Sequence, residues 1–272
     1  MDTGREEVEF LARSAHRVEV LSTLADGPQN RAHLSHKTGA SSPTMGRVLT
    51  DFEDRHWIER TGNTYRLTDL GRFVAEHVES LLEAMTTERR LREIWPWLPH
   101  AVEGFGVELF TDVVVSRPGP GYPYEPIERL TQLISETSTM RGFGMAVLKS
   151  GNLRPFFERT HNGLEVEYIY PPAVFEQLLS WNREVVTAAT RRENYTVLLH
   201  EELPLDERCG ICLFDDRVSI CCYDHETGTL QSLVDTESEA MRTWAKSYYQ
   251  RFRQEAAPLE AAADIGSTES IQ

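Results

Sequence analysis

Apolar residues recur every three or four positions between Ser42 and Asp54, which is the spacing of one buried helix face. The members of this face are Met45, Val48, Leu49 and Phe52. Ser42 is predicted to cap the helix, and Pro43 suits the first turn, where no amide hydrogen is needed. The opposite face is polar and is predicted to meet water or a partner; it carries Thr44, Arg47, Thr50 and Asp51.

A shorter helix is predicted just upstream. Asn30 can cap it, Ala32 and Leu34 are its apolar positions, and Lys37-Thr38-Gly39 is a stop signal. The two helices are therefore joined by a tight turn.

A hairpin is predicted downstream. Trp57 and Ile58 lead into a strand, residues 61–64 form a turn, and Tyr65 and Leu67 return with a period of two. A helix, a turn, a second helix and a hairpin in this order predict a winged helix-turn-helix.

The chemistry of this unit suits double-stranded DNA. A helix of this size enters the major groove by its N-terminal end, where amides, hydroxyls and long cations meet phosphates and base edges. The hairpin carries arginines on both sides of a polar tip, as a wing that follows the DNA backbone requires. The predicted contacts are Arg31, Ser41, Ser42, Thr44 and Arg47 in the helices and Arg60, Asn63, Thr64 and Arg66 in the hairpin. The alternative is a small helical domain that contacts only protein.

Two longer helices surround the winged unit. Residues 6–25 have apolar positions at helical spacing and are predicted to form one helix. Thr68 is predicted to cap another that runs to Arg92 and has more apolar surface than a small domain needs. Either a second domain buries this surface or the helix pairs with its copy. We favour a homodimer, because DNA half-sites usually require a two-fold protein.

After residue 100 the pattern changes to alternating strands and helices, which is typical of an α/β sheet covered by helices. The predicted strands are 108–116, 144–149, 164–170, 195–200, 210–214, 218–223 and 230–234. The predicted helices are 127–138, 153–160, one that begins at Pro171-Pro172, and 238–254.

The fold class is therefore α/β with two domains, joined by a long linking helix. We expect a winged helix-turn-helix over 1–68, a linking and dimerisation helix over 69–99, an α/β sensing domain over 100–256 and a disordered acidic tail over 257–272.

Charge is distributed unevenly along the chain. The 272 residues have a net charge of −15, yet residues 29–72 carry seven Lys or Arg against five Asp or Glu. The acidic excess thus lies outside the predicted DNA-binding segment. Arginine dominates over lysine, as in proteins of salt-loving archaea, although an ordinary acidic protein would also fit. The charged N-terminus and the absence of long apolar runs predict a cytoplasmic protein without membrane contact.

Four cysteines, Cys209, Cys212, Cys221 and Cys222, cluster in the predicted hairpin. Their spacing allows a zinc site or a redox pair. However, Cys221 and Cys222 point to opposite sheet faces, and Cys212 and Cys221 are expected to face each other across the strands. We favour buried, reduced thiols without metal, followed by a redox sensor and then by zinc.

Both halves resemble archaeal winged-helix regulators. The resemblance rests on TGASSPTMGRVLTDFEDRHWIER and YRLTDLGR in the first half, and on RGFGMAVLKSGNLRPFFERTHNGLEVEYIYPPAVFEQLL and GICLFDDRVSICCYDHETGTLQSLVDTESEAMRTWAKSYYQRF in the second. The second half is similar to the effector domain of regulators named after a methanogenesis regulator. It is more distantly similar to sugar-sensing archaeal regulators, whose sensing domain is phospholipase-D-like. The resemblance implies a DNA-binding transcriptional regulator that senses a small molecule.

No catalytic motif accompanies this likeness. A phospholipase-type site needs His-x-Lys, but His161 is followed by Asn162-Gly163 and His200 by two glutamates. We therefore expect no catalytic residues, cofactor or metal. Polar residues near predicted strand ends form a candidate effector pocket, in which Arg141 and Arg154 could hold an anion. Its members are Arg141, Arg154, Tyr170, His200 and Glu202, with Arg141 placed in a turn to Gly144.

Three alternative functions stay open. The chain could be a thiol-redox-responsive regulator, an enzyme domain fused to a DNA-binding module, or a general chromatin-type binder. The operator, the effector and the direction of regulation are not encoded in a recognisable motif.

Overall fold

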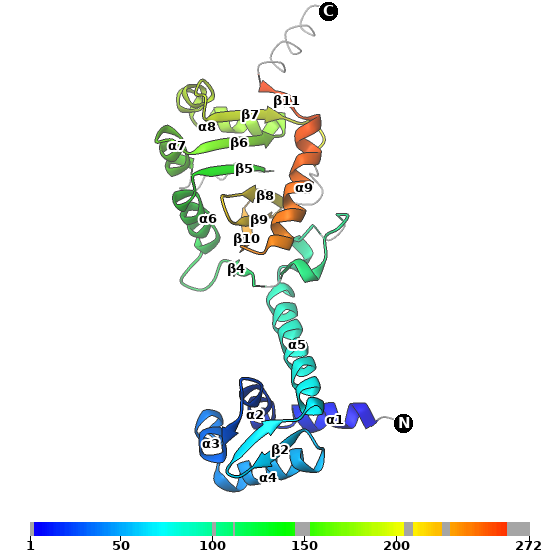
Figure 1. The fold of residues 1–272 in the computed structure, drawn as a ribbon. Coiled ribbons are helices and arrows are strands. Elements are labelled where there is room, and N and C mark those ends of the chain that lie inside the picture. Colours follow the sequence, from blue (N-terminus) through cyan, green and yellow to red (C-terminus); the bar gives the residue numbers. More distant parts are fainter. Residues whose placement is uncertain are drawn as a thin grey trace, which may run out of the picture. The chain divides into compact units, whose positions relative to one another are not determined.

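The computed structural model describes residues 3–99, 102–110, 112–144, 153–203, 209–224 and 229–259 (Figure 1). The chain divides into two compact units, Met1–Glu88 and Arg89–Gln272, and each is described by itself. None of the helices in the described segments combines the length and apolarity that crossing a membrane needs.

The first unit is a helical domain with a small three-stranded sheet. Its elements are α1 (Thr3–Ala12), α2 (Ala15–Ala25), β1 (Gln29–Asn30), α3 (Arg31–Thr38), α4 (Ser42–Asp54), β2 (Ile58–Thr61), β3 (Thr64–Leu67) and the first part of α5 (Asp69–Leu91). This order confirms the winged helix-turn-helix. The single helix predicted over 6–25 is wrong, because Ser14 has an extended backbone (φ −148°, ψ 113°) that ends α1 and starts α2.

The core of this unit forms around α4. Its predicted apolar face is confirmed: Met45 and Phe52 are fully buried, and Val48 and Leu49 nearly so. In α3, Leu34 is buried as expected, but Ala32 is exposed because it lies on the outer face of this short helix. Burial of such side chains supplies about 1.5–3 kcal/mol each.

The wing is an antiparallel hairpin of β2 and β3, to which β1 adds a third strand. The turn at residues 62–63 requires Gly62, whose φ of 62° favours a residue without a side chain. The register sets Glu59 opposite Arg66 and Arg60 opposite Tyr65.

The start of α5 is fastened to the residue that precedes the wing. The predicted cap is confirmed, since the Gly71 amide donates to Thr68 Oγ1 at 3.0 Å. The Thr68 amide in turn donates to the Trp57 carbonyl at 3.0 Å. A Cβ atom on Gly71 would lie 1.8 Å from that carbonyl oxygen, so only glycine permits this approach.

The second unit is an α/β sandwich around an eight-stranded sheet, which confirms the predicted fold class. The strand order is β11-β7-β6-β5-β8-β9-β10-β4. Strands β5, β6 and β7 run parallel, and the other pairs are antiparallel. The bounds are β4 (Val114–Ser116), β5 (Thr139–Phe143), β6 (Glu165–Tyr170), β7 (Tyr195–Leu199), β8 (Cys209–Leu213), β9 (Val218–Tyr223), β10 (Leu230–Thr236) and β11 (Ala257–Pro258).

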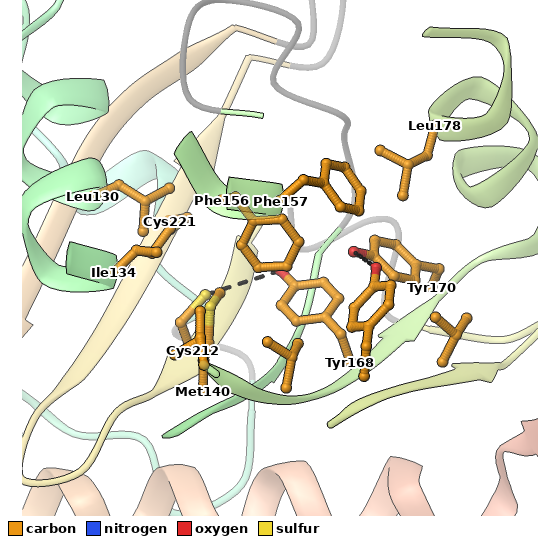
Figure 2. Close-up of a cluster of buried hydrophobic side chains, with 14 of the residues drawn as sticks. Leu130, Ile134, Met140, Phe156, Phe157, Tyr168, Tyr170, Leu178, Cys212 and Cys221 are labelled. Atoms are coloured by element: carbon orange, nitrogen blue, oxygen red, sulfur yellow. Dashed lines mark hydrogen bonds between the residues drawn. The ribbon is translucent and has the colours of Figure 1, made fainter. Parts of the chain in front are cut away.

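Helices cover both faces of this sheet (Figure 1). One face packs against α6 (Glu125–Glu136), α7 (Leu153–His161) and α8 (Pro172–Thr190). The other packs against α9 (Glu239–Glu255) and against residues of segments 91–99 and 102–110. Figure 2 shows the first of these cores, in which Phe156 and Phe157 of α7 lie over Tyr168, Tyr170 and Cys212 of the sheet.

One predicted strand in this unit needs correction, and two other expectations fall mostly outside the described segments. Residues 108–116 are not one strand, because Val107–Phe110 form a 3₁₀ turn (η2) that buries Leu109 and Phe110, and only β4 is extended. The strand predicted over 144–149 falls almost entirely outside the described segments, which end at Gly144 here; strand β5 occupies residues 139–143, where a turn was expected. Residues 260–272 of the expected disordered tail are also outside them, whereas β11 pairs with β7.

A buried carboxylate links helix and sheet in this unit. Asp235 on β10 is fully buried and accepts two hydrogen bonds from Arg129 of α6, at 2.7 and 2.9 Å. Arg217 adds a third at 2.6 Å. Because this burial is compensated by charge-assisted hydrogen bonds, the site fixes α6 on the sheet.

Candidate nucleic-acid interface

The corner between α3 and α4 presents the N-terminal end of α4. Gly39 adopts the left-handed conformation (φ 68°) that ends α3. Ser41, and not Ser42 as predicted, caps α4: its Oγ accepts from the Thr44 amide at 3.4 Å and lies 2.9 Å from Thr44 Oγ1. The cap is one residue earlier because Ser42 already has helical geometry and Pro43 occupies the second helical position.

Arg31 ties the beginning of α3 to the beginning of α4. Its Nη2 donates to the Ser42 carbonyl at 2.6 Å and to Ser42 Oγ at 3.2 Å. The guanidinium lies against Gly46, where a Cβ atom would approach Nη2 to 2.9 Å. Arg31, a predicted DNA contact, therefore uses part of its hydrogen-bond donors inside the domain, where they orient α4.

Arg47 lies one turn into α4 and is exposed. Unlike the other three predicted arginines, it makes no hydrogen bond or ion pair within the described segments. Its five donors are thus available to a partner, and its reach suits a guanine edge.

The wing arginines shape the hairpin. Arg60 Nε donates to the Gly62 carbonyl at 2.9 Å, and its guanidinium lies 5.6 Å from the centre of the Tyr65 ring. Arg66 forms an ion pair of 2.5 Å with Glu59 on the facing strand. At the tip, Asn63 is exposed and Thr64 is half-buried.

The far end of α4 is held by ion pairs that sequence reasoning missed. Asp51, expected to face water or a partner, instead accepts from Arg17 at 3.1 Å. Arg55 pairs with Glu7 at 2.8 Å. Both guanidiniums lie over the Phe10 ring, 3.8 and 3.7 Å from its centre. The helix is thus fixed at its base while its N-terminal half stays accessible.

The five predicted effector residues do not form one pocket. Arg141 lies within β5, not in a turn, and lines a hollow of about 470 Å³ with Glu165 and Glu193. Arg154 is bonded to Glu158 beside another hollow of about 750 Å³. The two arginines line separate hollows because Arg141 lies on strand β5 and Arg154 on helix α7.

The other three predicted effector residues also do not lie together. Tyr170 is buried in the core, and its hydroxyl lies 3.3 Å from that of Tyr195. Burial raises the pKa of Tyr170 well above its ordinary value. His200 and Glu202 line the same hollow, which also has a volume of about 750 Å³.

The cysteines form two pairs on opposite faces of the β8–β9 hairpin. The register sets Cys209 opposite Cys222, whereas Cys212 faces Ser219. Cys212 and Cys221 are therefore not directly paired as expected but are diagonal neighbours in contact on one face. The register follows from the closing hydrogen bond, in which the Phe214 amide donates to Arg217 and fixes a two-residue loop. The hydrogen bond to Cys221, together with burial, raises the pKa of the Cys212 thiol.

Across the described ranges, no three His, Cys, Asp or Glu side chains converge as metal ligands would.

Comparisons with known proteins cover both units. Residues 5–90 match the family model described as HVO_A0261 N-terminal domain, and residues 123–255 match that of the methanogenesis regulatory protein FilR1, middle domain. A search of the curated proteins found no match.

Several solved structures are distantly similar. The archaeal chromatin protein TrmBL2, described as having a novel mode of DNA binding, is 12% identical over 93% of this chain and 98% of its own, with a TM-score of 0.43. NucT from Helicobacter pylori is 17% identical over 54% of this chain and 99% of its own (TM-score 0.41). The phospholipase D family member Nuc from Salmonella typhimurium is 12% identical over 54% of this chain and 97% of its own (TM-score 0.40). On the two family matches, this chain is a regulator of the archaeal winged helix-turn-helix type, with an HVO_A0261-type N-terminal domain and a FilR1-type middle domain.

Proposed function

We propose that the chain is a sequence-specific, DNA-binding transcriptional regulator whose second unit senses a small molecule. In this proposal residues 1–68 bind DNA, 69–99 link and dimerise, and 100–256 sense the effector. The observation that carries it is Arg47, an exposed cation on the reading helix of a winged helix-turn-helix that forms no hydrogen bond or ion pair with any described residue.

The contacts have separate roles. Arg47 reads a base edge, while Ser41, Ser42 and Thr44 meet phosphate beside the helix N-terminus. Arg31 orients α4 and adds positive charge. Arg60, Asn63, Thr64 and Arg66 follow the backbone from the wing; Arg66 exchanges its bond to Glu59 for a phosphate.

The protein acts as a homodimer through α5. The apolar side chains Leu70, Phe73, Leu81, Leu82 and Met85 are each about half exposed, from 48 to 58%. Glu76, Glu79 and Glu83 lie away from this stripe by helical spacing. A second copy of α5 would bury the apolar stripe while the carboxylates stay in water, and would supply the two-fold symmetry of paired half-sites.

Selection from a random DNA library tests this function. The full chain should enrich one two-fold motif and bind it at least about a thousandfold more tightly than scrambled DNA at fixed salt. Equal affinity for all sequences would favour the chromatin-type alternative. Turnover of a small molecule by the purified protein would favour the enzyme alternative.

A further inference from the structure

We propose that the hollow beside His200 is the effector site, and that it takes a small organic cation with an apolar body and a hydroxyl or carbonyl group. This inference deepens the proposed function by naming the site and the chemical class of the effector. All residues of the proposed site lie in the second unit, so ligand binding there can be tested without DNA.

The hollow lies at the carboxyl end of a parallel strand. His200 directly follows β7, and its amide donates to the carbonyl of Tyr170, the last residue of the neighbouring β6, at 3.1 Å. Ligands of open α/β sheets collect at this edge. The beginning of α8 and the end of α9 supply further lining residues, Pro172 and Glu255.

The imidazole of His200 carries a buried nitrogen that makes no hydrogen bond. Only 7% of the side chain is exposed. Its Nδ1 accepts from the Glu202 amide at 3.0 Å, which places the proton on Nε2. Nε2 lies at an ion-pair distance of 3.5 Å from Oε2 of Glu255, which also lines the hollow, but it makes no hydrogen bond. A ligand oxygen would satisfy this donor, whose isolation is otherwise unfavourable.

The rest of the lining defines the ligand further. The described lining residues include four carboxylates, Glu176, Glu201, Glu202 and Glu255, against the single cation Arg183. A positively charged ligand is therefore favoured over an anion. An apolar wall stands beside these groups and consists of Phe175, Leu179, Leu199 and Leu259. The combination matches an amino alcohol or an amino carbonyl compound with a hydrophobic body.

Four probes with one shared aromatic body separate these features. 2-Amino-1-phenylethanol has the cation and the hydroxyl, and phenethylamine lacks the hydroxyl. 1-Phenylethane-1,2-diol lacks the charge, and mandelate reverses it. Titrations followed by NMR should show the amino alcohol to bind at least about tenfold more tightly than the diol and mandelate, and several-fold more tightly than phenethylamine.

Matched variants locate the binding. Glu255→Gln changes a largely exposed side chain and should weaken the amino alcohol several-fold, whereas Glu158→Gln, beside a different hollow, should not. His200→Phe should abolish the preference for the amino alcohol over phenethylamine. The inference is overturned if mandelate binds as tightly as the amino alcohol, if no probe binds, or if Glu255→Gln and Glu158→Gln behave alike. Operator affinity measured on the same protein separates these outcomes from a failure of the proposed function.

Discussion

The sulfur atoms of Cys209 and Cys222 lie 3.6 Å apart across the β8–β9 hairpin. Facing residues of an antiparallel hairpin alternate between hydrogen-bonded and non-hydrogen-bonded pairs. Counting from the hydrogen-bonded pair Phe214–Arg217 that closes the hairpin, Cys209 and Cys222 form a non-hydrogen-bonded pair. In such pairs the two Cα atoms are about 4.5 Å apart. That separation is compatible with a disulfide. Both thiols are nevertheless buried, and Cys209 also contacts the Trp97 carbonyl at 2.6 Å.

We therefore predict that all four cysteines stay reduced in mild peroxide, because a buried thiol in apolar surroundings reacts slowly. Thiol counting before and after treatment should give four in both cases, and metal analysis should find no zinc. Operator affinity should not change. A peroxide-dependent loss of DNA binding that disappears in a Cys209→Ala, Cys222→Ala variant would establish the redox alternative instead.

The other cysteine pair is expected to matter for stability. Replacing Cys212 and Cys221 with Val should alter the free energy of unfolding by about 1–3 kcal/mol, because both sites are fully packed. DNA affinity and its response to ligand should change less than stability does. Urea unfolding and anisotropy titrations on the same preparations check this, and the reverse ranking would contradict it.

Gly71→Ala should destabilise the first unit by about 3 kcal/mol, near the upper end of overpacking effects. The added Cβ would collide with the Trp57 carbonyl at 1.8 Å and displace the start of α5. Gly4→Ala is the control, since nothing lies within 4 Å of its added Cβ. Hydrogen exchange of peptides from residues 3–67 measures the effect on this unit. Equal protection in the two variants would mean that the close approach does not matter.

The second unit should lose stability in acid through Glu167. The Arg253 hydrogen bond, with help from the Tyr249 hydroxyl, holds the pKa of this carboxyl below its ordinary value of 4.5. Because the folded pKa is the lower one, the stabilisation is present above pH 4.5 and is lost as the pH falls through the folded pKa.

Glu167→Gln should therefore be less stable at pH 7, by on the order of 1 kcal/mol, and its unfolding should depend less on pH below 5. Glu165→Gln, an exposed neighbour on the same strand, serves as the control. Denaturation midpoints measured between pH 3 and 7 test the prediction. Parallel curves for the wild type and Glu167→Gln would exclude this contribution.

Charged residues at the apolar stripe of α5 should separate the dimer. Leu81→Glu with Met85→Glu places like charges where two copies would meet, so the variant should be monomeric and bind half-sites weakly. Glu79→Gln, outside the stripe, should stay dimeric. Light scattering at micromolar concentration measures the oligomeric state of the wild type and the variants. A monomeric wild type would contradict the proposed dimer.

Sequence reasoning succeeded where a pattern is local. The face of α4, the Thr68 cap and the hairpin turn at Gly62 each follow from a few neighbouring residues, and the structure contains all three. The α/β class also follows from the alternation of elements.

It failed where the answer depends on distant parts of the chain. The pairing of Cys209 with Cys222 depends on the closing pair of a hairpin, which shifts with one residue of loop length. Arg141 and Arg154 seemed to share strand ends with His200. However, Arg141 lies within β5, two strands from β7, and Arg154 lies in helix α7. The unsatisfied Nε2 of His200 has no sequence signal at all, since it depends on burial.

The central claim, that α4 reads DNA through Arg47, is tested most directly by Arg47→Ala at fixed salt. Loss of a good base contact costs about 1–3 kcal/mol, so affinity for the selected operator should fall roughly 10–100-fold while affinity for scrambled DNA changes little. Arg13→Ala removes an exposed charge from the turn after α1 and is the matched control. A folded Arg47→Ala variant that binds the operator as tightly as the wild type, in a mobility-shift titration beside this control, would contradict the account.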